Sequence, residues 1–203
     1  EMPEFSRRSL EILRQPLEDK VIRISRVYGT YDFPADFMLC AAMNPCPCGH
    51  YPDMNRCRCT PAQVMQYLGR ISQPLLDRLD LCAEVSPVDF EGLSSGRKGE
   101  STQTIRERVI CAQDIQRERY KIEGIQFNGE LSGAQIEKYC KMEKDARQLL
   151  KMAFQNMPFS ARAYHRILKV ARTIADMEAT ESIHRHHIAE ALSYRAFDKK
   201  YWN

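Results

Sequence analysis

The apolar residues near the start of the chain are spaced as in a helix. Leu10, Leu13 and Leu17 recur at intervals of three and four residues, and polar side chains separate them. This spacing predicts an amphipathic helix of about three turns. Ser6 is suited to cap its first turn, and Pro16 should end it because proline disrupts a helix interior.

The next residues follow strand patterns. Residues 21–33 alternate apolar and polar side chains around Gly29, which predicts a β-hairpin with its turn near residues 28–30. The run Asp36–Met43 is almost entirely apolar, as is typical of a central strand covered on both faces. A further strand is predicted at Leu79–Val85, so we expect the first part of the chain to be α/β with parallel strands.

Thr60 and Pro61 mark the start of another helix, as its N-cap and first residue. Phe90–Ser101 is rich in glycine, serine and charge, which predicts a linker. Helical spacing dominates the rest of the chain. The predicted helices are Thr102–Tyr120, Ser132–Cys140, Glu143–Met157, Ser160–Met177 and Ile183–Ala196. We therefore predict an α/β part at 1–89, a linker at 90–101 and an all-α bundle at 102–203.

Composition narrows the class of protein. The chain has 203 residues, 43% of them hydrophobic, which is enough for one good core or two small ones. The net charge of +3 is too small to indicate nucleic acid by itself, although locally basic faces remain open. No apolar run approaches the ~20 residues that cross a bilayer, so no membrane partner is expected. Eight unevenly placed cysteines favour a reducing cytoplasm, and a start at Glu1 without methionine suggests a cut inside a larger protein.

Four cysteines lie close together in the segment that follows the predicted central strand. Cys46, Cys48, Cys57 and Cys59 read C-x-C, eight residues, C-x-C. Two close pairs joined by a short loop provide the four thiolates that a tetrahedral Zn²⁺ requires, and four protein ligands favour a structural over a catalytic ion. His50 is an alternative to one thiolate. Free thiols or a disulfide are the remaining interpretations.

Four segments carry a resemblance to a known family. They are EMPEFSRRSLEILRQPLED, MNPCPCG, ISQPLLDRLDL and SARAYHRILKVARTIADME, in that order along the chain. Together they resemble the magnesium-chelatase-like AAA+ ATPases of the ComM/YifB type, over essentially the whole chain. The resemblance implies the C-terminal half of a AAA+ core with an inserted β-hairpin, followed by a helical lid.

The resemblance also assigns two residues to the reacting end of an ATP site. Glu1 matches the acidic residue at the end of the Walker B strand, which activates the attacking water beside Mg²⁺. Asn44 matches the sensor 1 residue, whose amide holds that water or contacts the γ-phosphate without adding charge. Outside the family context, Glu1 is an ordinary terminal glutamate, and an asparagine before proline is more often a turn residue.

Two arginines complete the implied site. Arg78 resembles the arginine finger, which enters the neighbouring subunit's site and neutralises charge on the transferred phosphoryl group. A local ion pair with Asp77 or Asp80 is the alternative. Arg162 resembles sensor 2, placed in the first turn of a helix, where anions are favoured. Arg166, one turn later, is an alternative, and a solvated basic face is the simpler interpretation.

The implied function is that of a motor. Zn²⁺ would be structural, and ATP with Mg²⁺ would bind in the full-length protein, which is expected to form a hexameric ring. Such a ring would remodel branched DNA during recombination in natural transformation, or remodel a protein partner. Arg23, Arg26 and Tyr31 of the hairpin suit single-stranded nucleic acid. The chain lacks the phosphate loop G-x4-G-K-[ST], so by itself it should not hydrolyse ATP. The alternative is a zinc-stabilised DNA- or protein-binding module without catalysis.

Overall fold

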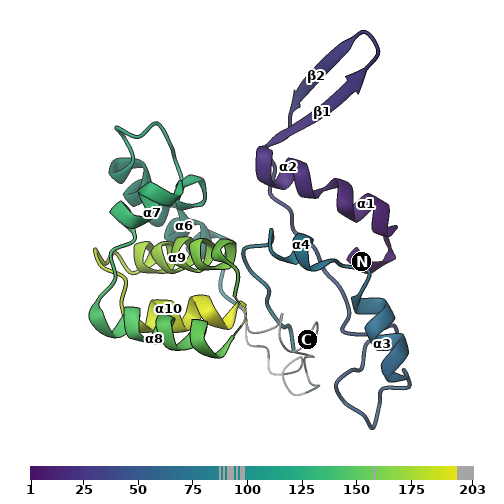
Figure 1. Cartoon of the computed structure of the whole chain (residues 1–203). Coiled ribbons are helices and arrows are strands. Elements are labelled where there is room, and N and C mark those ends of the chain that lie inside the picture. The colour runs from purple at the N-terminus through teal and green to yellow at the C-terminus, as the bar shows by residue number, and fades with distance from the viewer. Residues whose placement is uncertain are drawn as a thin grey trace. The chain divides into compact units, whose positions relative to one another are not determined.

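The computed structural model describes residues 1–86, 88, 90, 94, 96, 99–157 and 159–195, which form two compact units divided after Leu79 (Figure 1). In the first unit the elements are η1 (Met2–Glu4), α1 (Arg7–Ile12), α2 (Arg14–Asp19), β1 (Val21–Arg26), β2 (Gly29–Pro34), α3 (Pro61–Leu68) and α4 (Gln73–Leu76). In the second they are α6 (Thr102–Arg119), η2 (Asn128–Glu130), α7 (Gly133–Tyr139), α8 (Lys144–Asn156), α9 (Ala161–Met177) and α10 (Arg185–Ser193). Part of the predicted linker (91–93, 95, 97 and 98) and residues 196–203 lie outside the described residues, so the predicted domain limits stay a prediction.

The predicted first helix is two short helices, so the prediction that Pro16 ends it is wrong. The side chain of Ser6 accepts the N–H of Ser9 at 3.1 Å and caps α1, as expected. Pro16 lies in the first turn of α2. Main-chain N–H groups in a first turn have no partner within the helix, so the N–H that proline lacks is not needed there. The apolar face is as predicted, because Leu10 is buried and Leu13 packs against the same cluster.

The predicted hairpin is confirmed. β1 and β2 pair antiparallel around a two-residue turn, Val27 and Tyr28, and extend away from α2 (Figure 1). The register pairs Ile22 with Phe33 and Ile24 with Tyr31, which places these apolar side chains on one face.

The two further strands predicted from apolar runs are wrong for the described residues. Residues 36–43 and 79–85 are irregular, and the hairpin forms the only sheet in the part of the chain that the structure describes. An apolar run becomes a central strand only where neighbouring strands pair with its backbone, and none lies beside these segments in the described chain. The first run is consequently open to solvent, with Met38 91% exposed.

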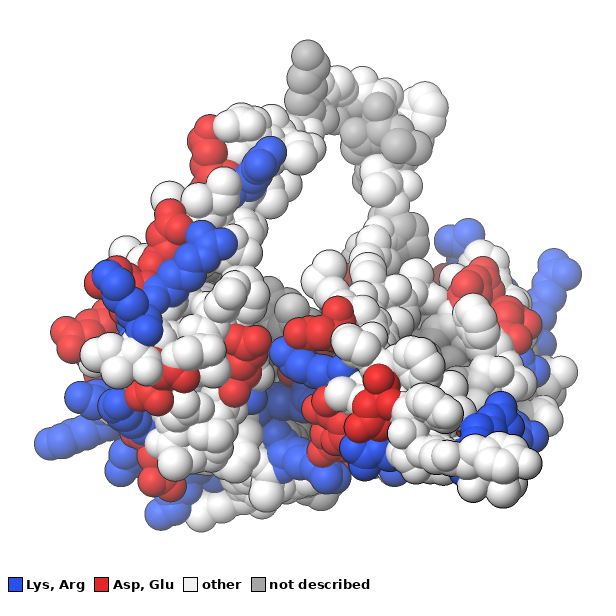
Figure 2. Space-filling view, turned by 90° about the horizontal axis from the view of Figure 1, so that it is seen from above, with Lys and Arg blue, Asp and Glu red and all other residues white. Residues whose placement is uncertain are grey.

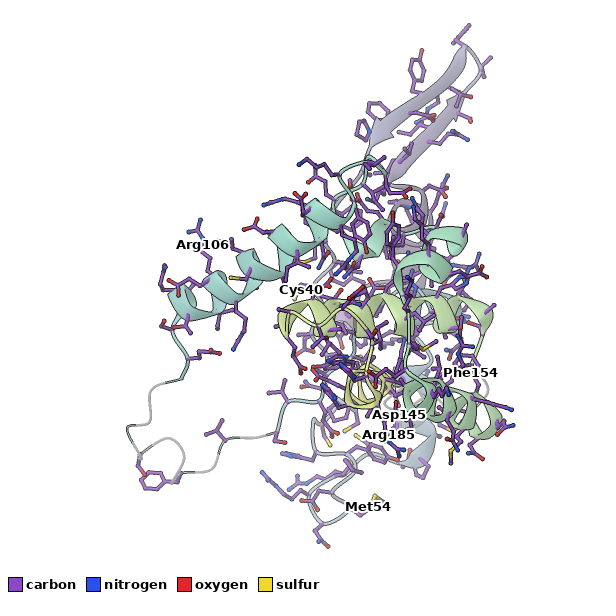
Figure 3. The ribbon with its side chains drawn as sticks, turned by 90° about the vertical axis from the view of Figure 1, so that its left-hand side faces the viewer. Cys40, Met54, Arg106, Asp145, Phe154 and Arg185 are labelled. Atoms are coloured by element: carbon purple, nitrogen blue, oxygen red, sulfur yellow. The ribbon has the colours of Figure 1, made fainter. Side chains whose placement is uncertain are left out.

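The second unit is a bundle centred on α9, which packs against α6, α7 and α10. Its helices begin and end within two residues of the predicted bounds wherever these are described. Phe154 of α8 meets Tyr164 of α9 edge to face at a centroid distance of 5.5 Å, and Phe159 lies tilted against Phe154 at 5.1 Å. Figure 3 labels Phe154 on its helix.

A buried carboxylate links the helices of this bundle. Asp176 of α9 accepts hydrogen bonds from Arg119 of α6 at 2.9 Å, Arg172 at 3.1 Å and Asn128 at 2.8 Å. Its side chain is fully buried. Because a buried charge is costly unless it is paired and hydrogen-bonded, this network holds α6, η2 and α9 in one arrangement.

Charge on the surface is mixed. Lys and Arg lie among Asp and Glu over the face shown in Figure 2. None of the described helices combines the length and apolar character needed to cross a membrane.

Candidate functional site

The N-terminal residues are fixed against the segment that leads to Asn44. The main-chain N–H of Met2 donates to the carbonyl of Ala42 at 3.0 Å, and the Met2 side chain is buried beside Ile71. Arg70 donates to the carbonyl of Pro3 at 2.8 Å. These contacts place Glu1 at the end of the 36–43 run, beside Asn44.

Glu1 and Asn44, the two residues that the family resemblance assigns to the reacting end of an ATP site, lie beside each other. Nδ2 of Asn44 lies 3.5 Å from Oε1 of Glu1, and both residues are exposed. A carboxylate can accept a proton from water, and an amide can orient water or a phosphate oxygen without adding charge. Their juxtaposition is therefore suited to activating a water molecule.

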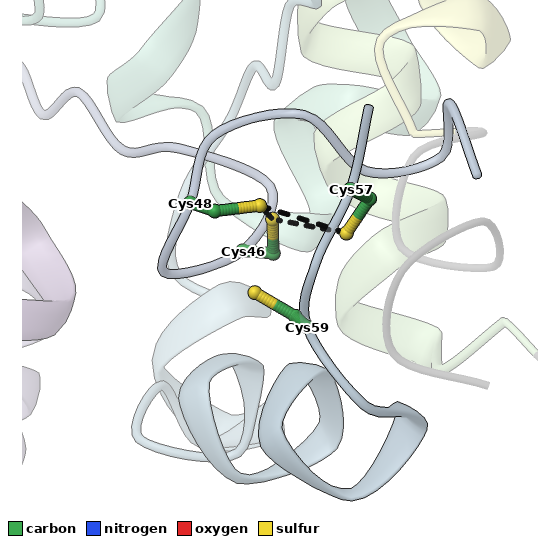
Figure 4. A group of neighbouring side chains, drawn as sticks. All are labelled: Cys46, Cys48, Cys57 and Cys59. Carbon is green, nitrogen blue, oxygen red and sulfur yellow. Dashed lines mark hydrogen bonds between the residues drawn. The ribbon is translucent and has the colours of Figure 1, made fainter. Parts of the chain in front are cut away.

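The four predicted metal ligands converge. The sulfur of Cys46 lies 3.4 Å from that of Cys48 and 3.8 Å from that of Cys57, and Cys48 and Cys57 are 3.6 Å apart. All four sulfurs, including that of Cys59, lie within 4.8 Å of one another and point to a common centre (Figure 4). A tetrahedral Zn²⁺ with Zn–S bonds of about 2.3 Å places its sulfurs about 3.8 Å apart. The geometry fits a metal ion, which would be held by Cys46, Cys48, Cys57 and Cys59.

The backbone of residues 44–59, here called the cysteine knuckle, explains this convergence. Gly49 donates its N–H to the carbonyl of Cys46 at 3.0 Å, and its φ of +80° is a left-handed value that favours glycine. Cys57 donates to the carbonyl of Asp53 at 2.8 Å, which closes the second turn. Met54 projects from the far end of the loop (Figure 3). Two tight turns thus bring the C-x-C pairs together.

The second C-x-C pair leads directly into α3. Cys59 precedes Thr60, whose hydroxyl accepts the N–H of Gln63 at 3.3 Å while the Gln63 side chain accepts the N–H of Thr60 at 2.8 Å. This capping box fixes the start of the helix, with Pro61 as its first residue, as predicted. The helix in turn fixes the direction in which Cys59 enters the knuckle.

The thiols of the knuckle differ in their proton affinity. Main-chain N–H groups of His50 and Arg58 lower the pKa of Cys48 to about 6, whereas burial raises the pKa of Cys59 to about 12. A bound divalent cation would favour the thiolate form of all its ligands. Four thiolates around Zn²⁺ carry a net charge of −2. Arg56 and Arg58 line the hollow beside Cys48, and their positive charges would stabilise this negative charge.

The alternatives for the cysteines are less well supported. His50 lies beside Cys48 in that hollow but is not among the four groups that converge. The four cysteines form no disulfide, because their sulfur distances are far longer than the ~2.05 Å of an S–S bond. Unrelated free thiols would have no reason to converge on one centre, so the convergence favours a shared metal ion.

Arg78 is engaged within its own unit. It donates to the carbonyl of Arg14 at 3.0 Å and to that of Pro74 at 2.7 Å, and it forms an ion pair with Glu18. The expected alternative partners, Asp77 and Asp80, are not the ones it uses. Because its side chain is only 10% exposed, Arg78 must leave these contacts to reach another subunit.

Arg162 lies in the first turn of α9, the position predicted from the sequence. Ser160 caps this helix by accepting the N–H of Ala163 at 3.1 Å. Arg166, the alternative, forms an ion pair with Asp80. Both arginines belong to the second unit, whereas Glu1, Asn44 and Arg78 belong to the first.

The hairpin carries less free charge than its sequence suggests. Arg23 binds Asp32 through two hydrogen bonds, at 2.8 and 2.9 Å. Arg26 and Tyr31 are exposed, as are the two turn residues, Val27 and Tyr28. The hairpin therefore presents apolar and aromatic side chains more than positive charge.

A histidine cluster in the second unit was not predicted. Nε2 of His186 and of His187 lie 2.8 and 2.9 Å from the same oxygen of Glu178. Nδ1 of His187 accepts the main-chain N–H of His184 at 3.0 Å, so its Nε2 carries the proton and donates to Glu178. This tautomer favours a hydrogen-bonded cluster over a metal site.

Comparison with known proteins identifies the family. The model of magnesium chelatase subunit ChlI matches residues 1–93, and the model of the ChlI C-terminal part matches residues 99–195. The chain belongs to the magnesium-chelatase-like family. The predicted family is thus confirmed.

Relatives extend the match to nearly the whole chain. YifB of Salmonella typhimurium is 46% identical over 98% of the chain, and the competence protein ComM of Haemophilus influenzae is 45% identical over 97%. YifB of Escherichia coli is 43% identical over 98%. The chain spans 38% of the length of each of these relatives.

Proposed function

We propose that this chain supplies the water-activating and phosphate-sensing residues of an ATPase site in a longer magnesium-chelatase-like protein. The contact between Glu1 and Asn44 carries the proposal, because a carboxylate and an amide 43 positions apart in the sequence lie side by side, as a pair that binds one water molecule would. Glu1 would accept a proton from the attacking water, and Asn44 would orient that water or the γ-phosphate. ATP and Mg²⁺ would be the cofactors.

The rest of the site would come from outside this chain and from a second subunit. The 203 residues contain no G-x4-G-K-[ST] sequence, so the phosphate loop would belong to another part of the longer protein. Arg78 would act as the finger toward a neighbouring subunit in a hexameric ring, after release from Glu18. Arg162 would contact the phosphates bound by its own subunit.

The substrate of this motor is proposed to be DNA. The relative ComM is named a competence protein, and a motor of this kind would remodel branched DNA during natural transformation. A protein partner is the alternative. The exposed face of the hairpin, with Tyr31 beside Ile24, is the surface of the first unit best suited to stack on bases.

The test uses the full-length protein with substitutions numbered as here. Glu1→Gln and Asn44→Ala should each lower kcat for ATP hydrolysis about 100-fold or more, with little change in KM. Glu4→Gln is the control, because Glu4 is also exposed and lies three residues from Glu1. Unchanged turnover in Glu1→Gln would refute the proposed role of Glu1.

A second candidate function rests on the cysteine knuckle. The four convergent sulfurs support a structural Zn²⁺, and a zinc-stabilised module can bind DNA or protein without catalysis. This candidate predicts metal-dependent binding to an oligonucleotide and no ATP turnover by the full-length protein. ATP hydrolysis that depends on Glu1 would exclude it as the whole function.

A further inference from the structure

We infer that Arg70 is a positioning residue that holds Glu1 beside Asn44 by binding the carbonyl of Pro3. This inference rests on the proposed function, because Glu1 is assigned there to the activation of water. Nothing in the sequence singles out Arg70, since a basic residue just after a helix is common and complements the helix dipole.

Glu1 is held through the turn that follows it. Its carbonyl accepts the N–H of Glu4 at 3.2 Å, which closes the short helix η1. The next residue, Met2, donates its N–H to the carbonyl of Ala42 at 3.0 Å and buries its side chain. The position of Glu1 therefore depends on the position of η1.

Arg70 binds η1 at its central residue. Nη1 of Arg70 donates to the carbonyl of Pro3 at 2.8 Å and lies 3.8 Å from Oε2 of Glu4. Only the first of these is a hydrogen-bond distance, and a charged donor strengthens that bond. The ion pair with Glu4 contributes less, because its side chains are 47% and 63% exposed and water screens their charges.

The main chain of Arg70 is itself fixed. Its N–H donates to the carbonyl of Tyr67, in the last turn of α3, at 3.3 Å. The next residue, Ile71, is buried in the same cluster as Met2. The guanidinium group therefore reaches Pro3 from a rigid part of the first unit.

One continuous segment consequently holds both members of the proposed reacting pair. Asn44 begins the cysteine knuckle, the knuckle leads into α3 through the capping box of Thr60, and Arg70 follows α3. Its side chain then returns to the turn that carries Glu1. Loss of the guanidinium would leave the Pro3 carbonyl without this donor and would let Glu1 move relative to the amide of Asn44.

The experiment uses the full-length protein with substitutions numbered as here. Arg70→Ala should lower kcat for ATP hydrolysis about tenfold and leave KM within about twofold, because the carboxylate is misplaced but nucleotide binding is not. Glu4→Gln, which removes only the ion pair, should keep the wild-type kcat. Arg117→Ala is the matched control, since Arg117 also donates a hydrogen bond, to Asp114 in the second unit.

A double substitution distinguishes positioning of Glu1 from a general structural role. If Arg70 acts through Glu1, then adding Arg70→Ala to Glu1→Gln should lower kcat by at most about twofold further, because no carboxylate is left to position. Amide hydrogen exchange gives a readout that does not depend on ATP. In Arg70→Ala it should quicken about tenfold in residues 2–5 and stay unchanged in residues 53–59 of the knuckle.

The outcomes separate this inference from the proposed function. Unchanged kcat in Arg70→Ala, or a further tenfold loss when Arg70→Ala is added to Glu1→Gln, would overturn the inference. An equal loss of kcat in Glu4→Gln would assign the effect to the ion pair and overturn it too, as would faster exchange in both segments. If the wild-type full-length protein hydrolyses no ATP, the proposed function fails, and exchange in residues 2–5 alone decides whether Arg70 holds this turn.

Discussion

The amide of Asn44 lies 3.5 Å from the carboxylate of Glu1, and the same amide rests over the turn made by Gly49 of the cysteine knuckle. The amide of Asn44 therefore lies between Glu1 and the first turn of the knuckle. Metal binding and water activation are thus expected to depend on each other through this residue.

The first prediction concerns the metal. The protein purified without chelators should contain about one zinc ion per chain, and Cys46→Ser should lose it because three thiolates complete the tetrahedron less well. Elemental analysis measures the stoichiometry. Hydrogen exchange should then quicken in residues 44–59 while α9 keeps its protection.

Cys111→Ser is the control for this experiment, since Cys111 is an exposed free thiol on α6. It should retain the metal. Zinc-free wild-type protein, or equal loss of protection in both units of Cys46→Ser, would contradict a local structural site.

The second prediction concerns the buried carboxylate of the bundle. Asp176→Ala should lower the free energy of unfolding by about 3–5 kcal/mol, because Arg172 and Arg119 would lose the partner of a buried charge. Urea denaturation followed by circular dichroism measures the change. Asp114→Ala removes an exposed pair with Arg117 and should cost at most about 0.5 kcal/mol. Similar losses in the two variants would refute the structural role of the network.

The third prediction concerns acid stability. Hydrogen bonds from Lys138, Tyr139 and Gln135 lower the pKa of Glu123 to about 2 from its ordinary value of 4.5. The stabilisation by ionised Glu123 is therefore present above about pH 4.5 and is lost as the pH falls toward 2. Melting temperatures should show that Glu123→Gln is less stable than wild type at pH 6, with the difference closing between pH 4.5 and 2. Glu137→Gln is the control, because Glu137 is an exposed glutamate of the same helix as Lys138.

The fourth prediction separates two roles of Arg78. Because Arg78 is largely buried against Glu18 and the carbonyl of Arg14, Arg78→Ala should destabilise the first unit by about 2 kcal/mol. If Arg78 is also the finger, Glu18→Gln should preserve ATP turnover by the assembled protein while Arg78→Ala abolishes it. Equal turnover in the two variants would mean that Arg78 serves its own unit only.

The features that sequence predicts well here are local. The hairpin, the capped helix at Thr60 and the helices of the bundle depend on spacing and capping within about 20 residues, and the structure has them. The convergence of the C-x-C pairs is equally local, because all four ligands lie in one short loop.

The features that sequence misses depend on distant partners. Asp36–Met43 has the composition of a central strand, yet a strand forms only where other segments pair with its backbone. Glu18 is the partner of Arg78 although it lies 60 positions away, and no spacing pattern in the sequence predicts a pair at that separation. The roles proposed for Glu1 and Asn44 came only from family resemblance, and composition and periodicity say nothing about the contact between them.

The sequence distance of each contact also bears on the order in which the first unit folds. The knuckle closes within residues 44–59 and leads into a self-capped helix, whereas the contact of Glu1 with Asn44 spans 43 positions. Closing a short loop costs less entropy than closing a long one. We therefore expect zinc to organise the knuckle early in folding, as a preformed platform on which the N-terminal residues later dock.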